Sequence, residues 1–455
     1  MAQYLKIWLL VVFLISKTLA DSDPFSVLEG QNPNGCSVLD LSQPIKLADA
    51  VAQALCANPQ THVAWANVRY QSALVGTSNT NYYPTLTANI ATSENHDSGK
   101  SVGSPNYSKL NGNVVFNYLL YDFGNRDALH NQATSAMLSS KNSYESAVQS
   151  VFFTTVQSYY NLFAAQASLE AYISAENAAK ESLDAVQTKV KAGIAVPADR
   201  LQARASYAQS ILTRVGAEGT LALAKGNFAA ALGLDAQTSL AVLPPQNSKN
   251  SPIPENRLND LVSKAKEMRP DLVAARSDIK TADAAIIAAK TSAMPTISLA
   301  SSVNAMDTSA STSTTSSNIG VNLSFPIFTG YATTYKIAEA KEQKGIKEAL
   351  AKSLEKQVTL DVYTAYTNLL TASNQEALTD DLVVSASASY DVSLGRYRAG
   401  VGTILDVVSS QALLSSAKQQ KVTTLYLLAI ARIALARALG DKELMNNELN
   451  KEVGQ

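Results

Sequence analysis

This chain of 455 residues carries 37 basic and 38 acidic side chains, a formal net charge of −1, so its overall charge offers no attraction to nucleic acid. It also lacks a basic cluster along the sequence that would supply one, and we expect no nucleic-acid partner. Hydrophobic residues make up 46% of the chain and aromatic residues only 7%, with Ala, Ser, Gln and Leu abundant, which favours long helices over a thick globular core.

The N-terminus has the layout of a secretory signal. Lys6 provides a positive charge, residues 7–15 are apolar, and small residues precede Asp21. The apolar stretch is too short for a comfortable transmembrane helix. We therefore expect residues 1–20 to be a signal peptide.

The chain has two cysteines, Cys36 and Cys56, and both lie in the exported part. An exported protein meets an oxidising compartment, so we expect them to form a disulfide. Two reduced, buried thiols are the alternative.

Taken in chain order, the first half predicts helices on both sides of a β-hairpin. Pro59 restarts a helix, because proline is tolerated in a first helical turn. After Pro84 the apolar residues alternate with polar ones, which is typical of strands. The predicted elements are a helix at 46–79, a hairpin at 85–118, a long helix at 126–191 and a returning helix at 198–232.

The second half repeats this order after a proline-rich linker at 244–254. The loop of its hairpin, Thr308 to Ser317, consists almost entirely of Ser and Thr. The predicted elements are a helix at 257–292, a hairpin at 296–325, a long helix at 333–398 and a returning helix at 403–439.

The two helical turns share one layout: two basic residues, Ala-Gly, a few apolar residues and Asp. Gly193 and Gly400 are 207 positions apart, and so are Asp199 and Asp406. Glycine tolerates the left-handed backbone that ends a helix, and Asp then caps the next one.

The repeated turn indicates a duplicated unit. We assign residues 21–244 to the first repeat and 245–440 to the second. Residues 441–455 are expected to form a loose polar tail.

The strands have apolar residues on one face and Thr, Ser, Asn or Gly on the other, as in outer-membrane barrels. Aromatic residues at the helix-proximal ends suit a bilayer interface; they are Tyr82, Tyr83, Tyr118, Tyr121, Phe325 and Phe328. Soluble sandwich strands are the alternative. Four strands would leave two unpaired edges in lipid, so several chains must complete a barrel. Periodicity does not choose between three and four copies.

In these features the chain resembles the TolC family of trimeric outer-membrane channels. The resemblance rests on Pro84 and Pro295 before the strands, Leu120–Arg126 and Pro326–Tyr331 after them, the turn Tyr397–Val407, and Ala-Leu-Gly at 231–233 and 438–440. It implies a mostly α fold with a small β part, in which a duplicated helical-hairpin and β-hairpin unit forms a trimer. The trimer has a twelve-stranded barrel in the outer membrane on a long periplasmic α-helical barrel.

The resemblance also implies an adaptor in the periplasm and an inner-membrane ABC transporter or other pump. Residues 36–59 resemble the type I protein-secretion branch that exports adenylate-cyclase toxin. The expected function is therefore an export duct for protein, with small-molecule efflux as the alternative. A periplasmic coiled-coil adaptor is an alternative of another class.

Family members restrict the channel entrance with acidic side chains, and the matching position is Asp406. A second family acid corresponds to Ser409, which weakens the expected double ring of carboxylates. A helix cap is the alternative role for Asp406, and the more frequent one for Asp199. The resemblance further implies that Tyr397 and Arg398 latch the closed turn, near Gly193 and Gly400, where the adaptor is expected to dock. Exposed, solvated side chains are the alternative for the latch.

The sequence offers no catalytic apparatus. His62, His96 and His130 are scattered without metal-ligand spacing, and phosphate-loop and hydrolase motifs are absent. We expect no enzyme activity, no metal and no cofactor.

Overall fold

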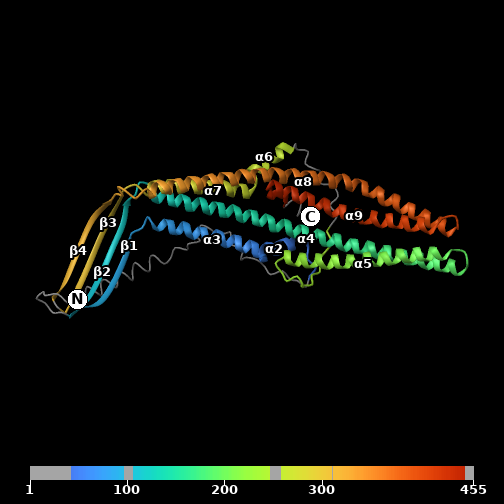
Figure 1. Cartoon of the computed structure of the whole chain (residues 1–455), viewed down its shortest axis with the longest axis horizontal. Helices are drawn as coiled ribbons and strands as arrows, with labels where there is room; N and C mark the ends of the chain where they lie inside the picture. The colour runs from blue at the N-terminus through green and yellow to red at the C-terminus, as the bar shows by residue number, and fades with distance from the viewer. Residues whose placement is uncertain (1–42, 97–105, 246–257, 310, 446–455) are drawn as a thin grey trace. The chain divides into compact units, whose positions relative to one another are not determined.

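The computed structural model describes residues 43–96, 106–245, 258–309 and 311–445 (Figure 1). The fold is mostly helical with one small sheet, as the composition predicts. Its elements are, in order, α2 (Leu47–Ala57), α3 (Pro59–Thr80), β1 (Thr85–His96), β2 (Asn106–Tyr121), α4 (Asn125–Lys191), α5 (Pro197–Ala231), α6 (Leu258–Met268), α7 (Pro270–Thr291), β3 (Thr296–Thr308), β4 (Ser311–Ser324), α8 (Ala332–Arg398) and α9 (Ile404–Leu439).

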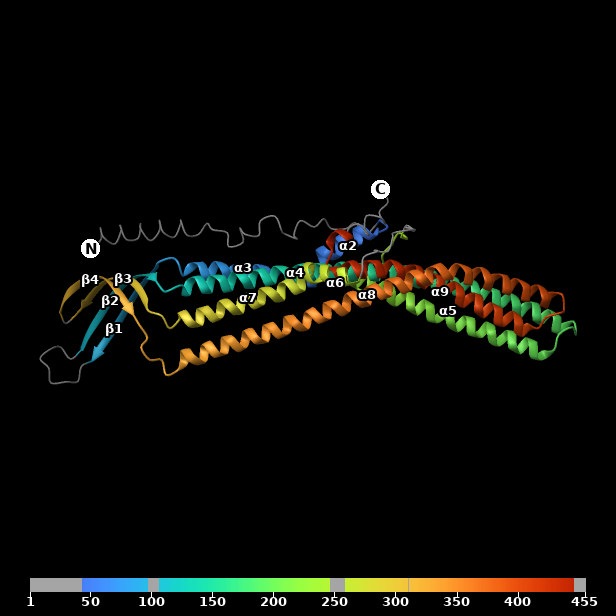
Figure 2. The same ribbon diagram turned by 90° about the horizontal axis from the view of Figure 1, so that it is seen from above.

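The second half of the chain repeats the order of the first with closely matched lengths. Helices α4 and α8 both have 67 residues, α3 and α7 both have 22, and α2 and α6 both have 11. Figures 1 and 2 show α5 returning beside α4, and α9 beside α8. The helices of the two halves therefore correspond one to one.

Prolines divide the shorter helices. Pro59 begins α3 and Pro270 begins α7. The helix expected over 257–292 is consequently two helices, α6 and α7, that meet at Arg269. A residue before proline is disfavoured in the helical conformation, which ends α6 there.

The strands are longer than the sequence pattern predicts. The first hairpin reaches Tyr121 and not residue 118, while β4 ends at Ser324 and starts at Ser311. The run of Ser and Thr at 311–317, expected to be loop, is paired with β3 through contacts such as Met306 with Thr314. β-Branched threonine fits an extended strand, so polarity alone did not identify a loop there.

The C-terminal tail expected from residue 441 begins later. Asp441 accepts a hydrogen bond from Lys264 Nζ at 2.6 Å. Leu444 packs against the same core as Met445, which is 3% exposed. These contacts anchor 441–445, because burial of two large apolar side chains outweighs the polar composition of the segment.

Residues 1–20 and Cys36 lie outside the described residues. The signal peptide and the disulfide therefore stay predictions. Cys56 lies half-buried on α2.

The four strands form one antiparallel sheet in the order β1-β2-β3-β4, and they lie side by side in that order (Figures 1 and 2). Asn89 on β1 pairs with Asn113 on β2, which pairs with Asn304 on β3. The neighbouring row places Val114 beside Val303. Because successive side chains alternate between faces, the register gives the sheet one amide-rich face and one apolar face.

The described residues divide into two compact units. The first comprises 66–96, 106–141, 274–309 and 311–352, and the second comprises 43–65, 142–245, 258–273 and 353–445. Each unit takes segments from both halves of the chain, so the compact units do not follow the repeats. The repeat boundaries remain a prediction from the sequence.

In the first unit, Asp278 on α7 holds two neighbouring helices. It accepts a hydrogen bond from Ser139 Oγ on α4 at 2.5 Å, and it pairs with Lys347 Nζ on α8 at 3.0 Å. A second ion pair joins Lys344 and Asp283 at 2.8 Å. Polar contacts thus link α4, α7 and α8 near the sheet.

The second unit contains the largest buried clusters. Tyr159 on α4 packs edge-on against Phe163 and Phe228, with ring centroids 5.0 and 5.9 Å apart. Its hydroxyl donates to the carbonyl oxygen of Leu243 at 2.6 Å. This cluster fixes α4, α5 and the segment after α5 against one another.

Among the described residues, α9 alone is long and apolar enough to cross a membrane, with a mean hydropathy of 1.6 over 18 residues. Several of its apolar side chains, including Leu428, Ile433 and Leu439, lie in the buried clusters. We interpret α9 as a core helix.

Candidate functional site at the helical tips

The two helical turns have the same backbone structure. Gly193 has φ of +72° and Gly400 has φ of +79°, the left-handed conformation that the sequence predicts. Beyond each glycine, an amide returns to the helix: Ile194 N–H donates to Lys189 O at 2.9 Å, and Val401 N–H donates to Arg396 O at 3.0 Å. Both long helices therefore end in a Schellman motif.

The capping of the next helix differs from the expectation. Thr403 and not Asp406 is the N-cap of α9, and Val196 is the N-cap of α5. Thr403 Oγ1 accepts from the Asp406 amide at 3.2 Å, and Asp406 Oδ2 accepts from the Thr403 amide at 3.1 Å. Asp406 thus completes a capping box from the third helical position, whereas Asp199 lies in the first turn of α5.

These hydrogen bonds keep the exposed Asp406 carboxylate charged. The Thr403 amide and hydroxyl stabilise the ionised form and lower the pKa of Asp406, and the positive charge of Arg396 adds to the effect. Asp406 therefore carries a fixed negative charge at the tip throughout the physiological range.

The two tips pack on each other through a small apolar cluster. The first hairpin contributes Leu183, Val186 and Ala203, and the second contributes Tyr397, Ile404 and Val407. Lys189 Nζ donates to the carbonyl oxygen of Tyr397 at 2.6 Å and lies 4.1 Å from the centre of its ring. The hairpins are therefore joined at their ends within one chain.

Of the two expected latch residues, the structure places only Tyr397 in this contact. Tyr397 is 6% exposed, and its buried hydroxyl has no hydrogen-bond partner among the described residues. Burial and the negative charge of Asp199 raise the pKa of Tyr397. Arg398 is exposed.

Sequence reasoning missed Lys189 and Thr403 as functional residues. A Thr three positions before Asp406 is a recognised helix-start signal, so Thr403 was identifiable. Lys189 lies 208 positions from Tyr397, and nothing in the sequence indicates their contact.

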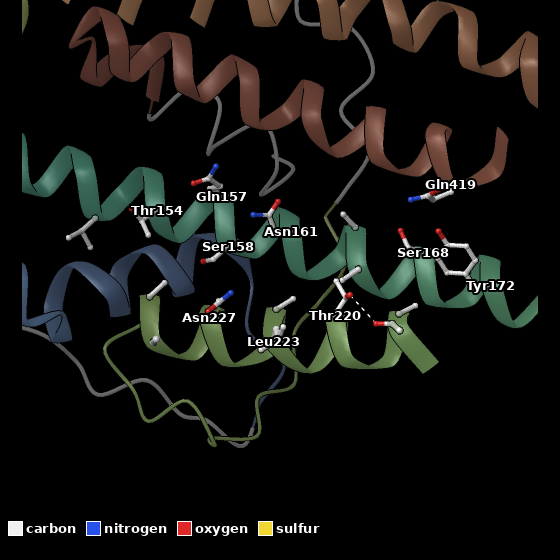
Figure 3. A pocket seen from close by; sticks show the side chains of 18 of the residues that line it. Thr154, Gln157, Ser158, Asn161, Ser168, Tyr172, Thr220, Leu223, Asn227 and Gln419 are labelled. Atoms are coloured by element: carbon white, nitrogen blue, oxygen red, sulfur yellow. Dashed lines mark hydrogen bonds between the residues drawn. The ribbon is translucent and has the colours of Figure 1, made fainter. Parts of the chain in front are cut away.

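A groove of about 1180 Å³ lies between the middle of α4 and the C-terminal part of α5 (Figure 3). Figure 3 shows polar side chains of both helices around it, among them Gln157, Asn161 and Asn227. Tyr172 is the one ionisable side chain among the described residues that line it. The groove thus provides hydrogen-bonding groups and space, without an acid–base pair.

The predicted interfacial aromatics lie where the sheet meets the helices. At the first junction, Tyr82 donates to Asp127 Oδ1 at 2.5 Å, and the Arg126 guanidinium lies 5.1 Å from the Tyr82 ring centre. Six aromatic residues were expected at this level, and those that the structure leaves exposed are Tyr83, Tyr121, Phe325 and Phe328.

Both sheet-to-helix junctions contain two consecutive residues with positive φ. These are Phe123 and Gly124 at the first junction, and Gly330 and Tyr331 at the second. The pairs are 207 positions apart, with the glycine and the aromatic residue exchanged. Left-handed backbone is unfavourable for aromatic residues, so the surrounding contacts must hold these turns in place; Phe123 packs on Tyr121 with ring centroids 4.8 Å apart.

Within the part of the chain that the structure describes, no group of three or more His, Cys, Asp or Glu side chains could hold a metal ion.

The geometry has close parallels among known proteins. The family model described as Outer membrane efflux protein matches residues 50–234 and 261–441. Protein CyaE of Bordetella pertussis is 27% identical over 408 residues, covering 88% of this chain and 85% of that protein. Outer membrane protein TolC of Escherichia coli (strain K12) is 24% identical over 449 residues, covering 94% and 89%. The structure of the Campylobacter jejuni CmeC outer membrane channel is similar with a TM-score of 0.80 at 19% identity, covering 89% of each chain.

Proposed function

Because the chain belongs to the outer membrane efflux protein family, we propose that three copies of it form one export duct through the outer membrane and into the periplasm. Members of this family are outer-membrane channels with a periplasmic portion, and they are not enzymes. Family membership overturns the alternative of a periplasmic coiled-coil adaptor.

The proposal that several copies assemble into one barrel rests on the sheet. Strands β1 and β4 are its edges, and each leaves one side without a strand partner among the residues that the structure describes. Unpaired strand edges are very costly in lipid. Pairing β4 of one copy with β1 of the next, three times, gives a closed barrel of twelve strands.

The two faces of the sheet suit such a barrel. The apolar face exposes large side chains, including Ile90, Ile319 and Leu323, and we place it against lipid. The opposite face carries the row of Asn89, Asn113 and Asn304, and we place it toward the pore.

The helices also leave apolar faces that neighbouring copies would cover. On α5 these are Leu201, Leu212 and Leu223, and on α8 they include Leu360 and Leu378, all exposed in the single chain. Exposed apolar residues at helical spacing are typical of helix–helix interfaces. We therefore propose a helical barrel continuous with the twelve strands.

We propose that the tips form the channel entrance, with Asp406 and Asp199 contributing carboxylates. Three copies of Asp406 would give a ring that favours cations. The contact of Tyr397 with Lys189 is proposed to hold the closed tip. Arg398, Gly400 and Gly193 are proposed to meet the adaptor.

The proposed partners are a periplasmic adaptor and an inner-membrane ABC transporter or other pump. Within this system we propose type I protein secretion, because the similarity to Protein CyaE covers most of both chains. Small-molecule efflux is the second candidate, since the similarity to Outer membrane efflux protein BepC of Brucella suis also covers most of both chains, at 23% identity.

Planar-bilayer recording tests the duct and its entrance. Purified wild type is expected to form trimers with a small, cation-preferring conductance, and Asp406→Ala is expected to lose that preference. Because its pKa is lowered, Asp406 should sustain the preference as pH falls through the ordinary aspartate range.

Asp406→Asn is the matched control, since it removes the charge and keeps an oxygen that can accept the Thr403 amide. A loss of preference in both variants supports the carboxylate ring. A loss in Asp406→Ala alone would assign Asp406 to helix capping only, and an assembled wild type that never conducts would contradict the duct.

Deletion of the gene distinguishes the two cargo classes. For protein secretion, we expect specific proteins to disappear from the culture medium while tolerance to small toxic compounds is unchanged. The measurement compares secreted proteins and growth inhibition between deletion and complemented strains. Unchanged secretion with reduced tolerance would favour efflux.

A further inference from the structure

The tips concentrate positive charge in a chain that is otherwise balanced. Residues 189–204 and 396–406 contain six basic side chains, and Asp199 and Asp406 are the acidic ones. The excess of four positive charges contrasts with a net charge of −1 for all 455 residues. No single stretch of sequence shows this, because the charges come from two segments about 200 positions apart.

Folding brings the two charged segments together at one end of the helical hairpins. The apolar cluster of Val186, Tyr397 and Ile404 joins the two tips. One of the six bases, Lys189, is used inside the chain, where it donates to Tyr397 O. The remaining five are exposed, and we name them the basic collar: Lys191, Arg200, Arg204, Arg396 and Arg398.

The basic collar forms no ion pair within the part of the chain that the structure describes, and the charge of Arg396 also acts on the Asp406 carboxylate. The ion pairs found among the described residues use other side chains. The carboxylate of Asp406, one of the two acids at the tips, accepts hydrogen bonds from Thr403 and not from a collar residue. The next exposed acids, Asp184 and Glu181 on α4 and Asp391 on α8, lie further from the helix ends and limit the collar to the tip.

Apolar side chains accompany the charges. Ile194 is 74% exposed, and Val196 and Leu405 are also exposed beside the collar. Arginine mixed with exposed apolar residues is typical of protein interfaces. The carboxylates of Asp199 and Asp406 would be repelled by an anionic bilayer, whereas a protein partner of mixed charge can accommodate them.

We infer that the basic collar is a docking surface for a carboxylate-rich helical segment of the periplasmic adaptor. This inference rests on the proposed function and adds the chemistry of the partner. Electrostatic complementarity would guide the encounter and fix the register of the two tips, and the apolar residues would supply contact area.

The test measures binding of a defined probe to the full-length trimer in detergent. The probe is a fluorescent helical peptide with glutamate on one face, and its counterpart carries glutamine at the same positions. A variant with all five collar residues changed to Gln is expected to bind the glutamate peptide at least about tenfold more weakly than wild type. Added salt should weaken wild-type binding in the same direction.

A matched variant removes the same charge elsewhere, with Gln at Lys225, Lys336, Lys341, Lys356 and Lys418, all exposed. It is expected to bind like wild type, and equal weakening in both variants would refute a specific collar. Arg396→Gln with Arg398→Gln provides a milder variant if the fivefold change prevents assembly. Its binding should fall between those of wild type and the full variant.

Two further outcomes overturn the inference in different ways. If wild type binds phosphatidylglycerol vesicles through the collar and does not bind the glutamate peptide, the collar is a lipid-binding surface and the inference is wrong. A conducting trimer whose peptide binding is unaffected by both collar variants would end this inference and leave the duct intact. Failure of wild type to conduct would instead reject the proposed function.

Discussion

Gly233→Ala and Gly440→Ala are expected to destabilise the protein far more than Gly193→Ala and Gly400→Ala. All four glycines end helices with positive φ, so alanine costs about 1 kcal/mol in backbone strain at each position. The surroundings differ. A Cβ at Gly233 would lie 2.7 Å from the carbonyl oxygen of Ala57, and one at Gly440 would lie 2.9 Å from Arg269 Cα.

At the two tip glycines, a Cβ would meet no atom of the described residues within 4 Å. Overpacking against backbone adds roughly 1–3 kcal/mol to the strain, because backbone cannot move aside as a flexible side chain does. The measurement is the apparent melting temperature of the detergent-solubilised oligomer, followed by helical circular dichroism. We expect clearly lower values for Gly233→Ala and Gly440→Ala than for the tip variants. Equal decreases in melting temperature at all four positions would show that the positive φ, and not the space around each glycine, determines the cost of alanine.

Gly233 and Gly440 lie against the two positions at which a proline interrupts a helix. Gly233 packs on the residues before Pro59, and Gly440 packs on the residues before Pro270. Each proline interrupts a helix, and each glycine allows the end of the returning helix to approach the interruption closely. The duplication therefore repeats a packing arrangement as well as an order of elements.

Local sequence signals predicted most helix and strand positions. Proline and glycine act through their own backbone preferences, so their effects can be predicted from the sequence without knowledge of the fold. This holds for Pro59, Pro270, Gly193 and Gly400. The starts of the elements also show a difference between the halves. The offset is 211 from β1 to β3 and 207 from α4 to α8, so the segment from the first strand to the long helix is four residues longer in the first half.

Contacts between distant segments were not predictable in this way. Lys189 was noticed only as part of a repeated turn, and its contact with Tyr397 depends on packing of the two hairpins. The basic collar needs the same packing. Likewise, the polarity of 311–317 suggested a loop because its pairing with β3 is a property of the sheet.

Arg269→Met is the second change with a large expected effect, because it removes the centre of a charged cluster. Arg269 Nη1 pairs with Asp361 at 2.6 Å, and Nε and Nη2 hold both oxygens of Asp271 at 3.1 and 2.6 Å. Burial alone would lower the pKa of Arg269, but these bonds outweigh it and raise the pKa. Arg269→Met removes the hydrogen-bonded partner of two partly buried carboxylates and leaves Arg437 as the counter-charge beside them, a loss on the order of 3 kcal/mol.

The matched control is Lys266→Met, which breaks a half-exposed pair with Glu355 at 2.9 Å and should cost less than about 1 kcal/mol. Arg269→Lys should be intermediate, since lysine keeps the charge but cannot bind Asp271 with a fork. Adding Asp271→Asn and Asp361→Asn to Arg269→Met should recover part of the loss, because the stranded charges are then removed. Apparent melting temperatures of this series decide the question. If Arg269→Met and Lys266→Met have the same melting temperature, solvent already screens the charges of the cluster. If Arg269→Met melts at a lower temperature, as expected, Arg269 holds α7 against α8 beside Gly440.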